Sequence, residues 1–388
     1  MRSTHLAYCR SELDDGEIAA VEDALRAGWL TSGPQVTAFE AAFAARARIA
    51  HAVALNSCTA ALHVALAAFD VGPGDEVVMP SLTFAAGAQC AMELGARPVF
   101  ADVDPQTLSV TRDTIAAVTT RRTKAIVTMP YAGRPLGIAE IAAFARERSI
   151  RVLEDAAHGC GMLDDGTWAG THSDAAAYSF YATKNLTTAE GGMLLTRDAA
   201  LAERARRLAL HGMSKDAWRR YEAGGTWRYD VSEPGFKYNM PDPLAALGVA
   251  GLARLDARQT RRAELAARYG ERITAIRGLR LPAPPARTAD RHAWCMYAVL
   301  VDERELRISR DELIDALAAR KIGTSVHYIP THRFTAYRGL ERAPLPNTEQ
   351  LAASVVSLPL YPAMQDRDVD DVLDALEFIA LPRVHAVG

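Results

Sequence analysis

Lys184 lies in the segment whose residue types and spacing are best suited to chemistry. The stretch 177–186 reads as the end of a strand that carries Ser179, followed by a short turn with the lysine and then by Glu190-Gly191-Gly192. A lysine in such a turn is most often a solvated loop residue. The alternative is an amine that forms a Schiff base with a carbonyl group of a cofactor. The choice between them depends on what the other strand ends supply.

A candidate phosphate site follows the predicted strand 51–55. The segment Asn56-Ser57-Cys58-Thr59 stands where this strand ends and a helix begins. Free backbone N–H groups and the positive end of the helix dipole favour a phosphate there, and Thr59 adds a hydroxyl donor. The alternative is that Ser57 or Thr59 only caps the helix, and taken alone this motif favours the cap. Ser179, five positions before Lys184, is placed to reach a phosphate while the lysine reaches a carbonyl.

Two carboxylates and one aromatic residue close other predicted strands. Glu154 and Asp155 are neighbours, so on a strand they point to opposite sides and only one can face a ligand. A buried carboxylate beside a pyridine nitrogen keeps that nitrogen protonated and makes the ring an electron sink. No His/Asp cluster accompanies the pair, which makes a metal site a weak alternative. Phe84 is either a core residue or an aromatic that stacks on a flat ring.

Short apolar segments alternate with helical patterns through the first half of the chain. This rhythm predicts an α/β fold with a mostly parallel sheet covered by helices on both faces, which binds ligands beyond the carboxyl ends of its strands. The motifs above are therefore expected to meet at one edge. The predicted strands are 51–55, 76–79, 98–101, 124–128, 151–154, 175–179 and 192–196, and the predicted helices are 59–70, 84–94, 113–118 and 138–148.

The remaining segments predict a second, smaller unit. A helical pattern over 15–48 is interrupted by a turn-rich link with Trp29, which is more often a packing residue than one that lines a pocket. A long helical region from 243 to about 276 is the predicted connector. The large domain is placed at 1–255 and a smaller α+β domain at 256–388. The smaller domain has predicted strands at 292–301 and 324–328 and helices at 309–319, 348–353 and 366–378, the first opened by a capping box from Ser309 to Glu312.

Composition excludes several classes of protein. With 388 residues, 49% hydrophobic and 23% charged residues and a net charge of −3, the chain has the composition of an ordinary soluble globular protein and no electrostatic footprint for nucleic acid. Its five cysteines are widely spaced without a C-x-x-C pair, so neither a disulfide framework nor a metal site is expected. The first residues lack the apolar run of a signal peptide and no stretch reaches the length of a membrane span, so a cytoplasmic location is expected.

Taken in order, these motifs resemble the DegT-type nucleotide-sugar aminotransferases, which are fold-type I pyridoxal phosphate enzymes. Within that family the likeness is greatest to 4-keto-sugar transaminases such as that of the 4-amino-4-deoxyarabinose pathway. The resemblance covers nearly the whole chain. It rests on Gly28-Trp29, Phe39-Glu40, Gly74-Asp75-Glu76-Val77, Pro80-Ser81-Leu82-Thr83, Gly95-Ala96-Arg97-Pro98-Val99-Phe100, Glu154-Asp155-Ala156-Ala157-His158, Ser179-Phe180, Lys184-Asn185, Glu190-Gly191-Gly192, Tyr238-Asn239 and Ser357-Leu358-Pro359-Leu360.

The resemblance implies a large domain with a seven-stranded sheet, a smaller C-terminal domain, and a homodimer with shared active sites. It implies pyridoxal 5'-phosphate as cofactor, with pyridoxamine 5'-phosphate as its intermediate form. Lys184 would be the Schiff-base lysine and the proton-transfer base, and Asp155 would pair with the pyridine nitrogen. The other implied cofactor contacts are Phe84 for ring stacking, Cys58, Thr59 and Ser179 for the phosphate, His158 for the phenolic oxygen, and Asn239 of the partner subunit, also for the phosphate. The implied substrate contacts are Trp29, His327 and Tyr328.

Two residues depart from the family pattern. Cys58 stands where many relatives have glycine or alanine, which affects the approach of the backbone to a phosphate. Pro130 stands where the family usually has histidine, in the segment Thr128-Met129-Pro130-Tyr131-Ala132-Gly133. The second departure leaves the substrate open more than the reaction class.

The implied reaction is transfer of an amino group from glutamate, which becomes 2-oxoglutarate, to a keto sugar carried on a nucleoside diphosphate. The 4-keto position is favoured, and a 3-keto sugar or a keto-cyclitol is the alternative. A sugar dehydratase on the same fold is a second alternative, but those relatives replace the lysine. A non-catalytic regulatory homologue is a third, although such a protein needs neither lysine nor carboxylate. The sequence leaves open whether the nucleotide is UDP or dTDP.

Overall fold

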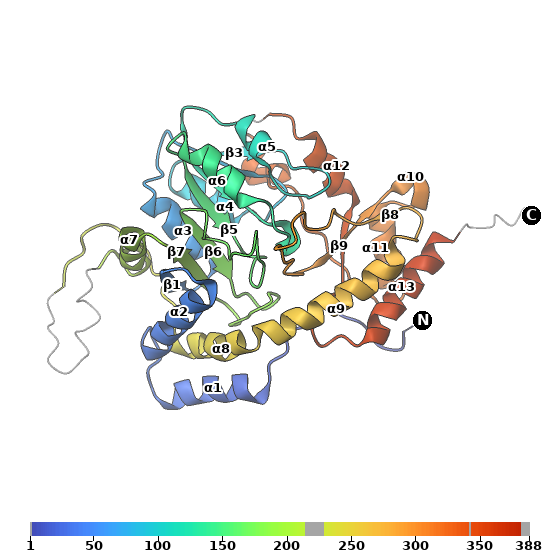
Figure 1. The fold of residues 1–388 in the computed structure, drawn as a ribbon, viewed down its shortest axis with the longest axis horizontal. Coiled ribbons are helices and arrows are strands. Elements are labelled where there is room, and N and C mark those ends of the chain that lie inside the picture. The colour runs from blue at the N-terminus through green and yellow to red at the C-terminus, as the bar shows by residue number, and fades with distance from the viewer. Residues whose placement is uncertain (1, 214–228, 341–342, 382–388) are drawn as a thin grey trace, which may run out of the picture.

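The computed structural model describes residues 2–213, 229–340 and 343–381. Its largest sheet has seven strands in the order β1-β7-β6-β5-β4-β2-β3 (Figure 1). Four pairings in this sheet are parallel, and β7 is antiparallel to both of its neighbours. The strands are β1 (His51–Leu55), β2 (Glu76–Pro80), β3 (Arg97–Ala101), β4 (Thr123–Thr128), β5 (Arg151–Asp155), β6 (Ala175–Ser179) and β7 (Gly192–Thr196).

Successive residues of a strand point to opposite sides of the sheet. Because most residues of these strands are apolar, both faces carry apolar side chains, and helices bury both. Met79 packs on the face covered by α3, α4 and α7, whereas its neighbour Val78 packs on the opposite face. That opposite face is covered by α2 and α8 over one part of the sheet and by α5 and α6 over the other. The helices are α1 (Asp15–Arg26), α2 (Pro34–Ala47), α3 (Cys58–Ala68), α4 (Ala86–Glu93), α5 (Arg112–Ala116), α6 (Ile138–Arg146), α7 (Ala199–Ala209) and α8 (Asp242–Ala253).

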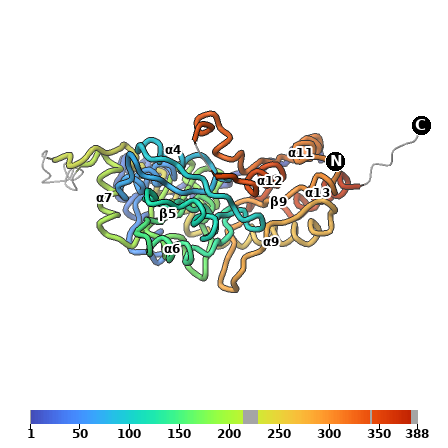
Figure 2. Tube along the Cα trace, turned by 90° about the horizontal axis from the view of Figure 1, so that it is seen from above, coloured from blue at the N-terminus to red at the C-terminus, as the bar shows by residue number. Residues whose placement is uncertain are grey.

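A second, antiparallel sheet has the order β10-β9-β8 and lies beside the large sheet (Figure 2). Its core includes residues of α9, α11 and α13. The capping box at Ser309 is confirmed, since Ser309 and Glu312 bond each other's backbone N–H groups. The elements are α9 (Leu255–Ile273), β8 (Leu279–Arg280), β9 (Tyr297–Val301), α10 (Glu303–Leu306), α11 (Arg310–Ala318), α12 (Pro346–Ser354), β10 (Val355–Leu358) and α13 (Asp366–Ala380), with short 3-10 helices at Tyr131–Gly133, Thr331–Arg333 and Thr335–Tyr337.

The predicted domain boundary between residues 255 and 256 stays a prediction. The start of the chain packs with the C-terminal sheet, since Leu6 exchanges backbone hydrogen bonds of 2.8 Å with Lys321 and Gly323. One hydrophobic cluster joins Val78 and Ile126 of the large sheet to Met296 and Leu300. Among the described residues, no helix is both long and apolar enough to cross a membrane.

The prediction of one long helical region from 243 to about 276 is wrong in one respect, because the structure has two helices there. Arg254, at φ −99° and ψ −3°, separates α8 from α9. Leu252 and Leu255, on either side of it, pack in the same hydrophobic cluster. The apolar pattern therefore continues through the break, and the sequence gives no sign of it.

Two predicted strands of the C-terminal part also differ from the structure. The segment 324–328 is not a strand: Ser325 alone pairs with Ser357, and the chain then leaves the sheet. The strand predicted at 292–301 begins only at Tyr297. Its first half bonds a turn of the large unit instead, through Ala293 N to Gly133 O at 2.8 Å and Cys295 N to Ala132 O at 3.0 Å. In both segments, hydrogen bonds to distant parts of the chain take the place of the strand-to-strand hydrogen bonds that a sheet would have.

Candidate active site

Lys184 lies in the hairpin turn between β6 and β7 and is half-buried. The turn is closed by backbone hydrogen bonds of 2.9 Å from Lys184 N to Tyr181 O and from Thr188 N to Phe180 O. The next residue, Asn185, is buried and donates its side-chain amide to the carbonyl oxygens of Ala293 and Cys160, at 2.6 and 3.3 Å. The lysine is thereby fixed to a rigid turn at the carboxyl end of β6.

Asp155 ends β5 and is buried. Its Oδ1 accepts hydrogen bonds from Ala157 N at 3.1 Å and from the Cys58 thiol at 3.7 Å. Burial raises the pKa of the Asp155 carboxyl, and the Ala157 N–H and the charge of Lys184 oppose this rise. The carboxylate and the ammonium group therefore act on each other across a site of low polarity.

Glu154 points to the other side of β5, as alternation along a strand requires. Its Oε1 accepts hydrogen bonds of 2.7 Å from Gly170 N and from the Ser173 hydroxyl. Its Oε2 is buried with no hydrogen-bond partner among the described residues. Burial raises the pKa of Glu154 to about 7. Of the two neighbouring carboxylates, Asp155 is thus the one in contact with the start of α3.

The start of α3 and the end of β6 meet at β7. Gly192 pairs with Leu55 on one side and with Ser179 on the other. Ser57 is the N-cap of α3, because its side chain accepts from Ala60 N at 3.0 Å. Capping by Ser57 leaves the N–H groups of Cys58 and Thr59, in the first turn, without partners inside the helix. The cap is therefore confirmed for Ser57, whereas the phosphate site at Cys58 and Thr59 stays a prediction, with which the N–H groups of the first turn are compatible.

A second group of predicted residues gathers around Tyr328. Its hydroxyl lies 2.8 Å from His158 Nε2, and the two rings are parallel with centroids 6.0 Å apart. The Phe84 ring lies 6.4 Å from that of Tyr328 and is 64% exposed, so one ring face is open. His327 bonds Ser357 Oγ through Nδ1 at 2.8 Å. These side chains come from three separate parts of the chain.

The histidines of this group are neutral at neutral pH. Burial, aided by the charge of Lys184, lowers the pKa of His158 far below its ordinary value. The same causes lower the pKa of His327 to about 4. The Nδ1 atom of His158 is buried and has no hydrogen-bond partner in the part of the chain that the structure describes. Because buried polar atoms nearly always have a hydrogen-bond partner, the unsatisfied nitrogen of this neutral imidazole is suited to bond a polar atom of a ligand.

Trp29 and Asn239 lie together at the link between α1 and α2. The Trp29 indole N–H donates to Ser32 O at 2.8 Å, and Asn239 Nδ2 donates to Ser32 Oγ at 2.8 Å. The Lys237 ammonium group bonds Asn239 Oδ1. Within one chain these contacts bring neither residue to Lys184. The role of Asn239 in the partner's site and that of Trp29 toward a substrate stay predictions.

The N-terminal segment also reaches the site, which the sequence analysis did not predict. The Tyr8 ring lies 5.5 Å from that of His327, the Cys9 thiol lies 3.8 Å from Thr183 O, and the Ser11 hydroxyl bonds Ala182 O. With Arg258 and Arg262 of α9 this segment lines a small hollow beside Lys184. Contacts between residues at least 171 positions apart in the chain leave no local pattern in the sequence. Among the described residues, no group of His, Cys, Asp and Glu could bind a metal ion.

The raised pKa of Glu154 predicts a dependence of stability on pH. A pKa raised by folding stabilises the protein fully below the ordinary value of 4.5, and this contribution is lost as the pH rises past about 7. Glu154→Gln keeps the acceptor oxygen but carries no charge. The free energy of unfolding in urea, relative to wild type, should therefore rise in this variant by ~3 kcal/mol between about pH 5 and about pH 8.

The matched control is Glu147→Gln, which changes an exposed carboxylate that pairs with Arg148. Its difference from wild type should not change with pH over the same range. A Glu154→Gln difference that is equally flat would contradict the assignment of a buried carboxyl that is protonated near neutral pH.

Known proteins resemble this chain over nearly its whole length. The chain is 46% identical over 382 residues to the spore coat polysaccharide biosynthesis protein SpsC of Bacillus subtilis, a match of 97% of this chain and 98% of that protein. Its structure is similar to that of the putative sugar aminotransferase Spr1654 from Streptococcus pneumoniae in its PLP form, with a TM-score of 0.89, 28% identity and 97% and 98% of the chains covered. It is also similar to DesI, solved in the presence of its TDP-sugar product, with a TM-score of 0.86, 33% identity and 98% and 94% covered.

These likenesses confirm the fold class expected from the sequence, that of the fold-type I pyridoxal phosphate enzymes. The model of the DegT/DnrJ/EryC1/StrS aminotransferase family matches residues 11–377, which include every motif described above. The chain therefore belongs to the DegT/DnrJ/EryC1/StrS aminotransferase family.

Proposed function

We propose that this protein is a pyridoxal phosphate-dependent sugar aminotransferase that moves an amino group from glutamate to a keto sugar carried on a nucleoside diphosphate, at the 4-keto position. One observation carries the proposal: Lys184 lies in the turn after β6, and the buried Asp155 ends the neighbouring strand β5 in contact with Cys58 at the start of α3. A structural lysine needs no buried carboxylate and no helix start beside it.

The residues present fit the cofactor. Free N–H groups at the start of α3, with the Ser179 hydroxyl beside them, suit a phosphate. Asp155 suits a protonated pyridine nitrogen, and the unsatisfied Nδ1 of His158 suits a polar oxygen of the ring. When bound, pyridoxal phosphate supplies a carbonyl group that an amine can capture and a ring that accepts an electron pair. The PLP and PMP forms of Spr1654 accord with this cofactor for the family.

The protein's own groups then divide the work. Lys184 would hold the cofactor through its amine and would be the group that moves a proton at the substrate carbon. Asp155 stabilises positive charge at the ring nitrogen. The exposed Phe84 would offer an apolar surface to the ring. The neutral His158, whose Nε2 bonds the Tyr328 hydroxyl, would hydrogen-bond the ring without adding charge.

The substrate class rests on the relatives. DesI was solved with a TDP-sugar product, and the name of SpsC places it in polysaccharide biosynthesis. A nucleotide-linked keto sugar is therefore the substrate class we propose for this chain. Glutamate as donor and the 4-keto position rest on the sequence resemblance, and a 3-keto sugar or a keto-cyclitol is the alternative.

The lysine assignment is tested by chemical reduction. Borohydride should fix the cofactor to the wild-type chain at Lys184, and Lys184→Ala should lose both this covalent label and turnover, because one amine performs both roles. Lys124→Ala, on β4, is the control and should keep both. The measurement is the intact mass after reduction. A label that persists in Lys184→Ala would refute the lysine assignment, and a wild-type protein without label would refute the cofactor.

The substrate is tested with a panel of UDP- and dTDP-linked 3-keto and 4-keto sugars and a keto-cyclitol, each with glutamate. We expect amination of a 4-keto sugar, with formation of 2-oxoglutarate as the readout for the donor. Preference for a 3-keto substrate or a cyclitol would overturn the regiochemistry and leave the reaction class intact. A dehydrated product would favour the dehydratase alternative.

We also propose a homodimer with shared sites. Large apolar side chains are exposed around Lys184, namely Phe84, Tyr181 and Ile329, and such groups on a surface often mark an interface. Asn239 of the partner subunit would then complete the phosphate site. Sedimentation velocity with parallel assays should show a dimer wherever the protein is active. A monomer with full activity at every concentration would contradict shared sites.

A further inference from the structure

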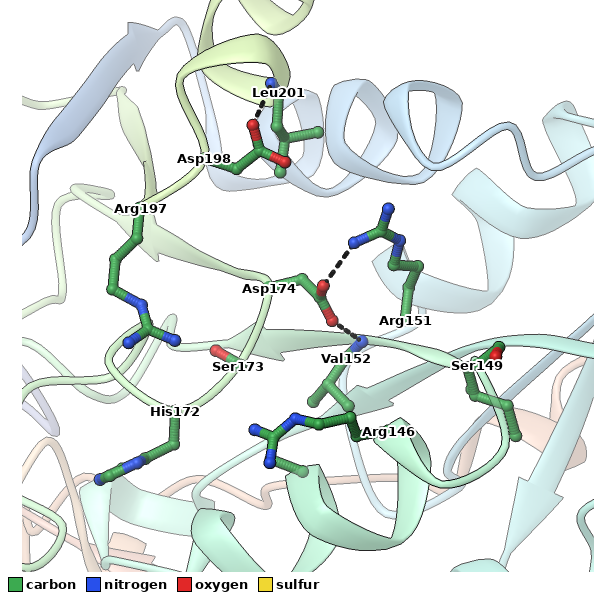
Figure 3. Close-up of a pocket in the computed structure, with 12 residues that line it drawn as sticks. Arg146, Ser149, Arg151, Val152, His172, Ser173, Asp174, Arg197, Asp198 and Leu201 are labelled. Atoms are coloured by element: carbon green, nitrogen blue, oxygen red, sulfur yellow. Dashed lines mark hydrogen bonds and ion pairs between the residues drawn. The ribbon is translucent and has the colours of Figure 1, made fainter.

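A cavity of about 470 Å³ opens at one edge of the large sheet (Figure 3). Its volume falls within the range of small-molecule pockets. It lies between the end of α6 and the start of α7, over the amino ends of β5 and β6. The polar residues that matter here are Arg146, Arg151, His172, Asp174, Arg197 and Asp198.

The cavity is separate from the candidate active site because the strands run from one to the other. Arg151 begins β5 in the cavity, and Asp155 ends the same strand at the site, about 13 Å further on. The antiparallel β7 begins with Gly192 at the site and is followed by Arg197 in the cavity. A ligand here would not touch the cofactor residues.

Both carboxylates of the cavity already have partners. Asp174 accepts from Arg151 at 2.7 Å and from Val152 N at 2.8 Å. Asp198 caps α7 by accepting from Ala200 N at 2.8 Å and Leu201 N at 3.2 Å. Neither carboxylate is therefore left to neutralise a further cation.

Two guanidinium groups of the cavity have no such partner. Arg146 and Arg197 form no ion pair or side-chain hydrogen bond with any residue that the structure describes, and Figure 3 shows them without a dashed line, on either side of the Ser173–Asp174 segment. His172 adds a third nitrogen-bearing group from the same rim. Two planar donor forks that line one hollow can match the oxygen atoms of a phosphoryl group.

We propose that this cavity binds the phosphoryl group of a small phosphorylated molecule, with Arg146 and Arg197 as its ligands and Arg151 fixed beside them by Asp174. The inference is independent of the proposed function, since it uses no residue of the candidate active site. It goes beyond that function by assigning a second anion site to the opposite edge of the sheet.

The test is calorimetric titration with inorganic phosphate of the wild-type holoenzyme, from which unbound pyridoxal phosphate has been removed, so that the bound cofactor fills its own phosphate site and no free cofactor competes for the cavity. One phosphate should bind per chain. Arg146→Gln/Arg197→Gln should weaken binding at least about a hundredfold, roughly tenfold for each charge-assisted contact. The control, Arg277→Gln/Arg280→Gln, removes the same charge from exposed residues near β8 and should leave the dissociation constant unchanged.

Wild-type protein that takes up no phosphate would overturn the proposal. So would an equal loss in the two double variants, because that would report net charge and not a site. If the Arg146→Gln/Arg197→Gln protein unfolds, the single variant Arg197→Gln takes its place, because Arg197 is exposed and its replacement should not disturb folding. This variant should bind phosphate about tenfold more weakly than the wild type. Unchanged binding in that variant would also refute the assignment.

Discussion

The site depends on one close approach, that of β7 to the start of α3. A Cβ atom on Gly192 would lie 2.3 Å from the carbonyl oxygen of Ser57 and 2.6 Å from the N atom of Cys58. No side chain fits there, so glycine at this position sets how near the helix start can come to the sheet. Because Gly192 also pairs with Ser179, the same residue sets the distance between the helix N–H groups and the hydroxyl that we assign to one phosphate.

The second constraint is electrostatic. Burial raises the pKa of the Cys58 thiol and of the Tyr328 hydroxyl, and burial lowers the pKa of His158 and of His327. All four groups are therefore neutral at neutral pH. The interaction between Lys184 and Asp155 is left without a competing charge from these four neighbours, and a low-polarity surrounding strengthens it. Cys58, the departure from the family pattern, fits this arrangement as an uncharged donor to Asp155.

The sequence predicts best what depends on local pattern. The strands at 51–55, 175–179 and 192–196 have the predicted bounds, because strands buried on both faces read as short apolar runs. The alternation of Glu154 and Asp155 follows from the strand period alone. The approach of Tyr8 and Cys9 to the site does not follow from any pattern, since it is fixed by a single backbone pairing of Leu6 with the C-terminal unit. The break at Arg254 is likewise invisible, because both flanking leucines remain apolar and buried.

Strand β5 shows why position on a parallel sheet decides chemistry more than residue type does. It contains one arginine and two carboxylates in five residues. Arg151, at the exposed amino end, pairs with Asp174 and serves the rim of a cavity. Glu154, one residue before the other end, points to the opposite side of the sheet from Asp155. Burial raises its pKa to about 7. Asp155 ends the strand near the end of β6 and the start of α3, where a carboxylate, the Lys184 turn and the first N–H groups of a helix come together. A carboxylate in this strand gains a chemical role when the register places it at the carboxyl edge and the alternation turns it toward α3.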